Sequence, residues 1–304
     1  MKLSDKVKLA LDENRTIILG AQVLLGFHLH GVFQDGFAAL PRDSRLVECA
    51  GQALMALAIG LLIAPSMQHR LVEDGQDTTR IHRVAGLFAG LALIPFGISL
   101  GLSVFIVFDH MFDRGIALAA GAIFCLLAAF FWFGLELAVK PIVEASSMSQ
   151  DKADTPADTP MVVKIDQMLT EARVVLPGAQ ALLGFQLAVA FTRAFEQLSA
   201  IPRLVHVGAL ICIALATILL MTPAALHRIS FAGEDSAKFF RMGSAFVIAA
   251  PAPLALGIAG DLYVATFKAS ESSALGVAVA GLALVTLIGL WYAAPLILRM
   301  RRAH

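Results

Sequence analysis

The sequence predicts an all-α, polytopic membrane protein with eight transmembrane helices, arranged as two parallel four-helix repeats. Its 304 residues are 58% hydrophobic and only 15% charged, with a mean hydropathy of +0.79. They contain eight apolar stretches of about 20 residues, enough for a helix to cross a bilayer core of about 30 Å. A shift of 158 residues superimposes the two halves, and 27 of the 67 positions from Leu11 to Asp77 are identical to those from Leu169 to Asp235.

The spans are predicted near residues 16–38, 45–66, 84–108, 115–138, 174–195, 203–223, 242–266 and 274–297. Charged amphipathic segments precede the first and the fifth span. We expect Met1 to Arg15 and residues 162–169 to form short helices at the membrane surface before the chain turns inward. The first segment lacks the apolar core of a secretory signal and is expected to be retained. Pro95 and Pro253 are expected to interrupt the third span of each repeat.

The duplication also defines the domain organisation. The first four-span repeat covers residues 1–143 and the second covers residues 162–304. Residues 144–161 between them are polar and contain two copies of Ala-Asp-Thr-Pro, which predicts a disordered linker. Of the 23 lysines and arginines, 17 lie in the termini, in this linker and in the loops on the same side. The linker and both termini are therefore predicted to be cytoplasmic, and the two repeats to have the same orientation.

Several motifs of the second half are partly kept in the first. They are ExRVxxPGAQxLLGFQ in residues 171–186, PxxxHR in residues 223–228 and GxD in residues 233–235. On these motifs the chain resembles a bacterial integral-membrane family known only as a domain of unknown function, typically a single four-span unit. The resemblance implies a protein of the bacterial plasma (inner) membrane without an established activity. The first half departs from the pattern with Leu19 for the proline, His28 for the second glutamine and Ser103 for an aspartate.

Charged residues kept in both copies flank the predicted cytoplasmic ends of the spans. They are Glu13, Arg15, His69, Arg70, Asp77 and Arg83 in the first repeat, and Glu171, Arg173, His227, Arg228, Asp235 and Arg241 in the second. Glu13 and Arg15 are two residues apart on a helix, so each needs a partner from another element, such as Arg70 or Arg83 for the glutamate. We predict a charge cluster on the cytoplasmic face of each repeat that ties the helix ends together. The alternative is a binding site for an anionic headgroup or a small cytoplasmic ligand, formed by Arg15, Arg70 and Arg83.

Two glutamines, Gln22 and Gln180, lie inside predicted spans, where an amide without a hydrogen-bond partner is costly. On a helical wheel each shares a face with a glycine, a leucine and a phenylalanine: Gly26, Leu29 and Phe33 in one copy, and Gly184, Leu187 and Phe191 in the other. We interpret this face as a packing seam with an interhelical hydrogen bond. The alternative is a polar lane for a permeating solute.

Ionisable groups inside a span are functional candidates because they can carry protons. His28 and His30 lie past the middle of the first span, but their counterparts in the second copy are Gln186 and Ala188. This asymmetry argues against a proton relay common to both halves. The two histidines point to nearly opposite faces of the helix, so no metal site is expected. Asp261 is expected near the outer end of the seventh span, as a solvated or capping carboxylate.

The sequence contains no phosphate-binding loop, zinc-protease motif, nucleophile elbow or dinucleotide fingerprint. We therefore expect no enzymatic activity, cofactor or metal. Basic residues are spread along one membrane face, so no nucleic-acid partner is expected. Membrane lipids are the expected partners. Gly86 and Gly90, and Gly97 and Gly101, offer close-packing helix faces within the bundle or between the subunits of a homo-oligomer.

These features predict an integral membrane protein with a structural, ligand-responsive or lipid-responsive role. The alternative is a small-solute or proton transporter or channel, with a pathway between the two repeats lined by Gln22, Gln180 and His28. An aqueous cavity between the repeats would favour transport, whereas a dry apolar seam would favour the structural role. A third interpretation is an enzyme acting on a lipid, for which only Glu13, His69 and Asp77 supply clustered catalytic groups.

Overall fold

The computed structural model describes residues 3–134, 159–229, 231 and 236–302, and their side chains from residue 17 onward except at 228, 229 and 302. All regular structure in these residues is helical. The predicted disordered linker lies outside the described residues, apart from residues 159–161.

Four long helices form the first repeat. They are α1 (Leu3–Gly31), α2 (Arg42–Leu71), α3 (Thr79–Met111) and α4 (Arg114–Ala129). The 3-10 turn η1 (Asp35–Ala39) joins α1 to α2, and the π-helical turn η2 (Phe130–Gly134) continues α4.

The second repeat follows the same plan with more interruptions. Its first two spans are α6 (Met161–Ala190) and α8 (Ala200–Ile229), joined by the short α7 (Arg193–Glu196). The third span consists of α9 (Ala237–Ala249) and α10 (Pro251–Ser270). The fourth consists of α11 (Ser273–Ile288), the π-helical turn η3 (Gly289–Ala293) and α12 (Ala294–Arg302).

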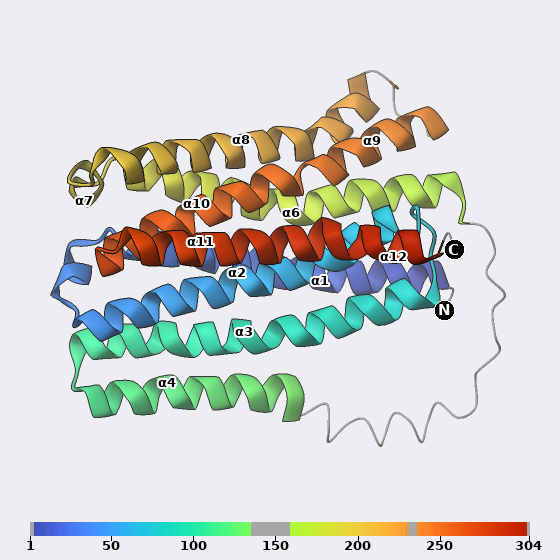
Figure 1. Cartoon of the computed structure of the whole chain (residues 1–304). Helices are drawn as coiled ribbons and strands as arrows, with labels where there is room; N and C mark the ends of the chain where they lie inside the picture. Colours follow the sequence, from blue (N-terminus) through green and yellow to red (C-terminus); the bar gives the residue numbers. More distant parts are fainter. Residues whose placement is uncertain (1–2, 135–158, 230, 232–235, 303–304) are drawn as a thin grey trace.

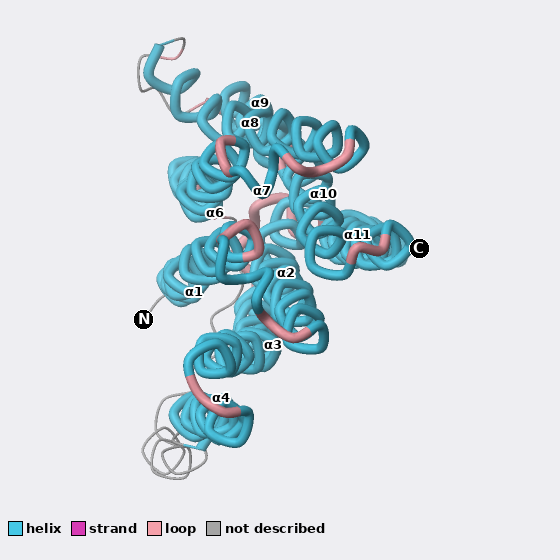
Figure 2. The backbone as a smooth tube through the Cα atoms, turned by 90° about the vertical axis from the view of Figure 1, so that its left-hand side faces the viewer, coloured by secondary structure: helices cyan, strands magenta, loops and turns pink. Residues whose placement is uncertain are grey.

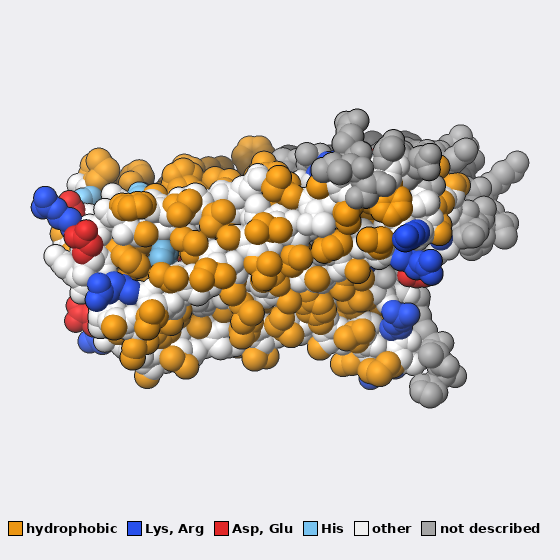
Figure 3. All heavy atoms as spheres, turned by 90° about the horizontal axis from the view of Figure 1, so that it is seen from above, with side chains coloured by type: hydrophobic (Ala, Val, Ile, Leu, Met, Phe, Trp, Pro, Cys, Tyr) orange, Lys and Arg blue, Asp and Glu red, His pale blue; other side chains and the backbone are white. Residues whose placement is uncertain are grey.

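The helices confirm the predicted multi-pass membrane fold. By length and hydropathy, seven of these spans are able to cross a membrane, and the apolar part of α1, Ile17–Gly31, supplies a shorter eighth. Exposed apolar side chains cover the flank of the bundle seen in Figure 3, whereas charged side chains gather at its two ends. Such an apolar belt matches the hydrocarbon layer of a bilayer rather than water.

The predicted surface helices are wrong. Residues 3–15 belong to the continuous helix α1, and residues 162–169 belong to the continuous helix α6. In α6 this segment is also held against protein, because the side chains of Ile165, Gln167 and Met168 are buried. The amphipathic pattern in α6 therefore reflects packing against neighbouring helices and not contact with a membrane surface.

The prolines act differently in the two copies. Helix α3 runs through Pro95 without a break, contrary to the prediction. In the second repeat the third span is divided just before Pro251, which is the first residue of α10, and Pro253 follows two residues later. Two prolines within three residues remove two backbone donors, whereas a single proline removes one. The N-caps of the third spans are equivalent, because Thr78 and Ser236 both accept a hydrogen bond from the backbone three residues later.

The helices run side by side along one axis, with both chain termini at the same end of the bundle (Figure 1). We call this the terminal end, and the opposite end, which carries η1 and α7, the distal end. Seen end-on, α2 lies in the middle, α4 lies at one margin and α8 with α9 lies at the other (Figure 2). Helix α2 packs against α1 and α3 of its own repeat and against α10, α11 and η3 of the second, while α1 packs along α6.

Most of the seam between the repeats is formed by apolar side chains. Leu25, Ile59, Leu182 and Leu254 are all fully buried there. The indole Nε1 of Trp291 in η3 donates a hydrogen bond to a backbone carbonyl of α2 across the seam, over 2.9 Å. A groove of about 450 Å³ lies between α2 and α11, but its lining is alanine, leucine and valine with a single threonine. Among the described residues, the seam thus offers no polar pathway.

Candidate functional site: a buried histidine and carboxylate in each repeat

Each repeat places three side chains together near the distal ends of its first three spans. In the first repeat they are His28 on α1, Glu48 on α2 and Ser103 on α3. The 158-residue shift maps these positions onto Gln186 on α6, His206 on α8 and Asp261 on α10. Each set contains one histidine, one carboxylate and one neutral hydrogen-bonding side chain, but the three roles lie on different helices. We call these two sets the first and the second site.

His28 is the centre of the first site. Its Nδ1 lies 2.6 Å from Oε1 of Glu48, and its Nε2 lies 3.0 Å from Oγ of Ser103 and 3.4 Å from Oγ of Ser99. The amide of Gln52 donates to the backbone carbonyl of His28 over 3.2 Å. Only 6% of His28 and 6% of Glu48 is exposed. Both ionisable groups are therefore held inside the protein, and a direct hydrogen bond joins them.

Hydrogen bonds also connect the first site to the backbone. The hydroxyl of Ser99 can donate to the carbonyl of Gly51, and that of Ser103 to the carbonyl of Ser99. Each hydroxyl also lies within hydrogen-bond distance of Nε2 of His28, which donates or accepts according to the tautomer of the ring. The contact of 2.6 Å between Nδ1 of His28 and Oε1 of Glu48 places a hydrogen between these two atoms. The first site thus pairs a histidine directly with a carboxylate.

The second site uses the same space with a different arrangement. The amide of Gln186 donates to Oδ2 of Asp261 over 2.8 Å, and Nε2 of His206 donates to the backbone carbonyl of Gln186 over 3.0 Å. Nδ1 of His206 lies 3.9 Å from Oδ1 of Asp261, too far for a direct hydrogen bond. The three side chains border a cleft of about 10 Å³, close to the space that one water molecule needs.

Access to the two sites differs sharply. The first site lies at the base of a pocket of about 430 Å³ between α1, α3 and η1, with Leu24, Phe27 and Ile106 among its apolar walls. In the second repeat the equivalent space is reduced to the small cleft, because Leu29 and Phe33 of α1 close it. The second site is therefore sealed inside the chain, whereas the first is open.

The predicted glutamine seam is half correct. Gln22 is completely buried at the contact of α1 with α6, but within the described residues neither of its amide atoms has a hydrogen-bond partner. A Cβ on Gly178 would lie 1.5 Å from Oε1 of Gln22, so this close packing requires a glycine. Gln180 does not lie at the seam at all, because its side chain is exposed on the outer face of α6. The predicted hydrogen bond across the seam is therefore wrong.

The polar lane predicted for a transporter is not assembled either. Gln22 is buried between α1 and α6, Gln180 is exposed, and His28 faces α2 and α3 inside the first repeat. His30 receives a hydrogen bond from the amide of Gln34 over 2.8 Å and takes no part in the first site. These side chains share no common path.

One further sequence interpretation is overturned. Asp261 is not a solvated carboxylate, because only 3% of it is exposed and Gln186 donates to it. The absence of a proton relay common to both halves stays a prediction. His206 nevertheless supplies a histidine to the second site from another helix.

The predicted cytoplasmic clusters form between the repeats and not within each one. Glu171 of α6 accepts hydrogen bonds from Nδ1 of His69 over 2.8 Å and from Nε of Arg70 over 2.5 Å, both on α2. Arg70 also lies 5.6 Å from the ring centre of Phe240 and donates to Ser244. We call Glu171, His69 and Arg70 the interrepeat clasp. Arg70 is 4% exposed and paired with Glu171, so it is not available to the predicted headgroup site, and the side chain of Arg15 lies outside the described residues.

Asp77 lies beside the clasp, in the loop between α2 and α3. Its Oδ1 accepts a hydrogen bond from Gln167 of α6 over 2.7 Å, and its backbone N–H donates to Thr159 over 3.0 Å. Burial raises the pKa of Asp77 above its ordinary value of 3.8, while the bond from Gln167 and the charge of His69 act in the opposite direction. The loop of one repeat is thus fastened to the first helix of the other.

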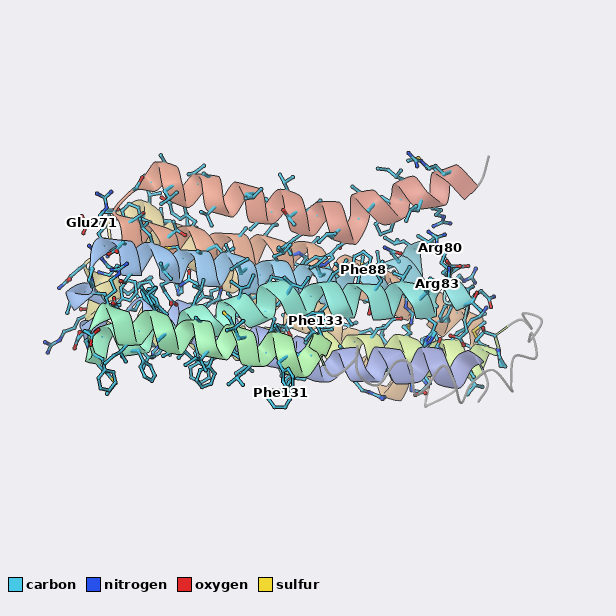
Figure 4. The ribbon with its side chains drawn as sticks, turned by 90° about the horizontal axis from the view of Figure 1, so that it is seen from below. Arg80, Arg83, Phe88, Phe131, Phe133 and Glu271 are labelled. Atoms are coloured by element: carbon cyan, nitrogen blue, oxygen red, sulfur yellow. The ribbon has the colours of Figure 1, made fainter. Side chains whose placement is uncertain are left out.

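The remaining predicted charges are scattered or lie outside the described side chains. Arg83, Arg173 and Arg241 are exposed. Figure 4 shows Arg83 near Arg80 at the terminal end of α3, with Glu271 at the other end of the bundle and Phe131 pointing outward. His227 packs its ring 4.6 Å from that of Phe239. The side chains of Glu13, Arg15, Arg228 and Asp235 lie outside the described residues.

Sequence reasoning missed Glu48 and His206, which complete the two sites. The signal was present in the internal comparison, because these two residues occupy the same position under the 158-residue shift. Glu48 corresponds to His206, and His28 corresponds to Gln186. This pattern indicates that the histidine lies on the first span in one repeat and on the second span in the other. Only the contact of the three helices shows that the exchanges belong to one site.

Among the described residues, no group of three histidine, cysteine, aspartate or glutamate side chains is placed to hold a metal ion.

Comparisons with known proteins address the duplication. The model of one protein family, described as Family of unknown function (DUF6328), matches the chain twice, at residues 3–136 and 163–295. No curated protein and no solved structure matches the chain. Because the two matches cover both halves, the chain belongs to the DUF6328 family and carries the family unit in tandem.

Proposed function

We propose that this protein is a non-enzymatic integral membrane protein of the bacterial plasma membrane, with cytoplasmic termini, that responds to pH through its two buried histidine–carboxylate sites. In this proposal the ligand to which the protein responds is the proton. The observation that carries the proposal is that both repeats keep a histidine and a carboxylate at the same three positions while the helices that supply them are exchanged.

The physical argument begins with the cost of charge in a membrane. A lone ionised group inside a span is costly, but a histidine and a carboxylate that share one proton are neutral together. Loss of that proton leaves one negative charge, and gain of another leaves one positive charge. Since histidine ordinarily titrates near neutral pH, such a pair converts a change of pH into a change of charge inside the bundle.

Transport between the repeats receives little support from this geometry. Most of the seam is formed by apolar side chains, and the groove between α2 and α11 is apolar as well. The two histidine–carboxylate sites lie inside separate repeats and are not joined by a polar pathway among the described residues. Binding of protons at each site fits this arrangement better than passage through the bundle.

The first site also resembles a hydrolase triad in the order of its contacts, from Ser103 through His28 to Glu48. Two features argue against acyl transfer. The carbonyl of Ser99 lies 2.9 Å from the hydroxyl of Ser103 and competes with the histidine for its hydrogen. Its neighbours on α3 belong to a continuous helix, whose backbone N–H groups are already bonded and cannot form an oxyanion hole.

Infrared titration of the purified protein in lipid tests the proposal. We expect a pH-dependent carboxylic acid band that is reduced in Glu48→Gln and in Asp261→Asn and reduced further in the double variant, where the other carboxyl groups such as Asp77 account for what is left. Both substitutions keep a hydrogen-bond acceptor but cannot ionise. Glu271→Gln, an exposed carboxyl outside both sites, is the matched control and should leave the band unchanged.

An unchanged band in the double variant would overturn the proposal. The same preparation in liposomes separates the alternatives: proton flux down an imposed gradient would favour a transporter. Covalent labelling of Ser103 by a fluorophosphonate, lost in Ser103→Ala, would favour an enzyme.

A further inference from the structure

The two copies of one helix face are in opposite environments. On α1 and the turn that follows it, this face consists of Gln22, Gly26, Leu29 and Phe33, which are all buried. We call it the seam face. On α6 the equivalent face consists of Gln180, Gly184, Leu187 and Phe191, which are all exposed. Leu187 is 47% exposed and Phe191 is 85% exposed.

The seam face of α1 fits the second repeat closely. A Cβ on Gly26 would lie 2.0 Å from the ring of Phe185, and a Cβ on Gly178 would clash with Gln22, so each helix offers a glycine to a side chain of the other. Further along, Leu29 and Phe33 close the second site. The receiving surface on the second repeat therefore consists of Gly178, Phe185 and the rim of that site.

The first repeat carries the same receiving surface, but nothing covers it within the described chain. Six residues of the second repeat border the small cleft: Phe185, Gln186, Val189, His206, Asp261 and Val264. Their counterparts under the 158-residue shift all line the open pocket: Phe27, His28, Gly31, Glu48, Ser103 and Ile106. The pocket of about 430 Å³ is therefore the second-repeat cleft without the leucine and phenylalanine that close it.

We propose that a second copy of this chain covers the pocket, by placing the exposed face of α6 against α1 as the seam face of α1 is placed against α6. The partner's Leu187 and the partner's Phe191 would then close the first site, as Leu29 and Phe33 close the second. The partner's Gln180 would lie beside Gly20, where a Cβ would meet only Phe96, at 4.0 Å.

Three features identify a second copy as the occupant. The complementary face already exists in the sequence, and the chain itself shows how it docks. Copies inserted the same way up bring α6 and α1 together in parallel, as they are within one chain. A bare glycine exposed to lipid, such as Gly184, lacks the packing contacts that a protein partner supplies.

The interface differs in kind from a symmetric helix pair. Each copy offers one donor face on α6 and one receiving pocket on the first repeat, so the contact is heterologous. Both are used only when copies close into a ring, and a dimer is the smallest ring. This inference concerns assembly and goes beyond the proton sites, since it makes no use of their titration.

Substitution of an open glycine tests the interface. Gly184 has no atom within 4 Å of the place where a Cβ would lie, so Gly184→Leu should leave the single chain folded. Gly281 on α11 has equally open surroundings, and Gly281→Leu is the matched control. We expect wild type and Gly281→Leu to form oligomers in dilute liposomes by single-molecule photobleaching, and Gly184→Leu to be monomeric. A monomeric wild type, or oligomers in Gly184→Leu equal to the control, would overturn the inference.

Cysteine cross-linking provides a second test, which does not require the interface between copies to be disrupted. In a background without Cys49, Cys125 and Cys212, we expect Leu187→Cys combined with Ile106→Cys to give a covalent dimer under oxidation, because their counterparts Leu29 and Val264 border the same cleft. The control pair uses Ile211→Cys, an exposed position on α8, with Ile106→Cys. Equal cross-linking of both pairs, or none in the first, would contradict the proposed contact.

Discussion

Glu171 is the residue on which the contact between the repeats depends most at the terminal end. It is 3% exposed and accepts hydrogen bonds from both His69 and Arg70. Two of these three side chains come from one repeat and one comes from the other. A buried charge that loses its only counter-charge is strongly destabilising, although a complete pair contributes little by itself.

Glu171→Ala should therefore lower the free energy of unfolding by about 3–5 kcal/mol, because it leaves Arg70 buried without its counter-charge. Asp43→Ala is the matched control, since Asp43 pairs with Arg114 at an exposed position, and should cause no measurable change. Unfolding in mixed micelles measures both. Equal losses in the two variants would show that the clasp is not specific.

Asp77 provides a prediction of pH dependence. Burial raises its pKa above the ordinary 3.8, so the folded protein binds this proton more tightly than the unfolded protein does. Stability is then fully retained below 3.8 and is lost as the pH rises through the folded value. Asp77→Asn still accepts the bond from Gln167 but cannot ionise. We expect the variant to gain in thermal midpoint relative to wild type as the pH rises above 3.8, with no such gain in Glu196→Gln.

At the scale of elements, the contact between α1 and α6 is set by glycines. Gly178→Ala places a methyl group where Gln22 lies, with Cβ of Gln22 only 2.5 Å away. Overpacking of this kind typically costs about 1–3 kcal/mol. Gly208→Ala on α8 is the matched control, because no atom lies within 4 Å of its added methyl group and alanine favours a helix.

We expect Gly178→Ala to lower the free energy of unfolding and Gly208→Ala to leave it unchanged or raise it slightly, both measured in mixed micelles. A loss confined to Gly208→Ala would show that the contact of α1 with α6 yields more readily than its geometry indicates. The comparison also separates packing from helix propensity, since both sites lie inside long helices.

At the scale of the whole molecule, helix α2 joins the two repeats. It packs against α10, α11 and η3 in addition to its own neighbours, and Trp291 of η3 is fully buried against it. Residues 1–150 and 151–304, expressed together as separate chains, should therefore copurify from membranes.

Trp291→Ala should reduce this copurification, since truncation of a buried tryptophan costs about 3–5 kcal/mol and also removes its hydrogen bond to Gly60. Trp132→Ala is the control, because Trp132 packs against Phe96 within the first repeat. Equal yields of the paired halves in wild type and Trp291→Ala would contradict the role assigned to the seam.

The sequence by itself determined the class of the protein, its eight spans and its duplication. These features follow from local quantities, namely the length of apolar stretches and the recurrence of residues after a fixed shift. The sequence also identified the seam face on α1 and Glu171 as a member of a charge cluster at the ends of the spans. None of these conclusions required knowledge of which helices are neighbours.

Only the tertiary structure decided which partners meet. Glu171 binds Arg70 of the other repeat, Gln22 packs on Gly178 while Gln180 is exposed, and His28 meets Glu48. The physical reason is that two similar patterns need not receive the same neighbours. Helix α1 packs its seam face on α6, while the equivalent face of α6 is exposed. Contacts between helices depend on this docking, which no periodicity along the chain records.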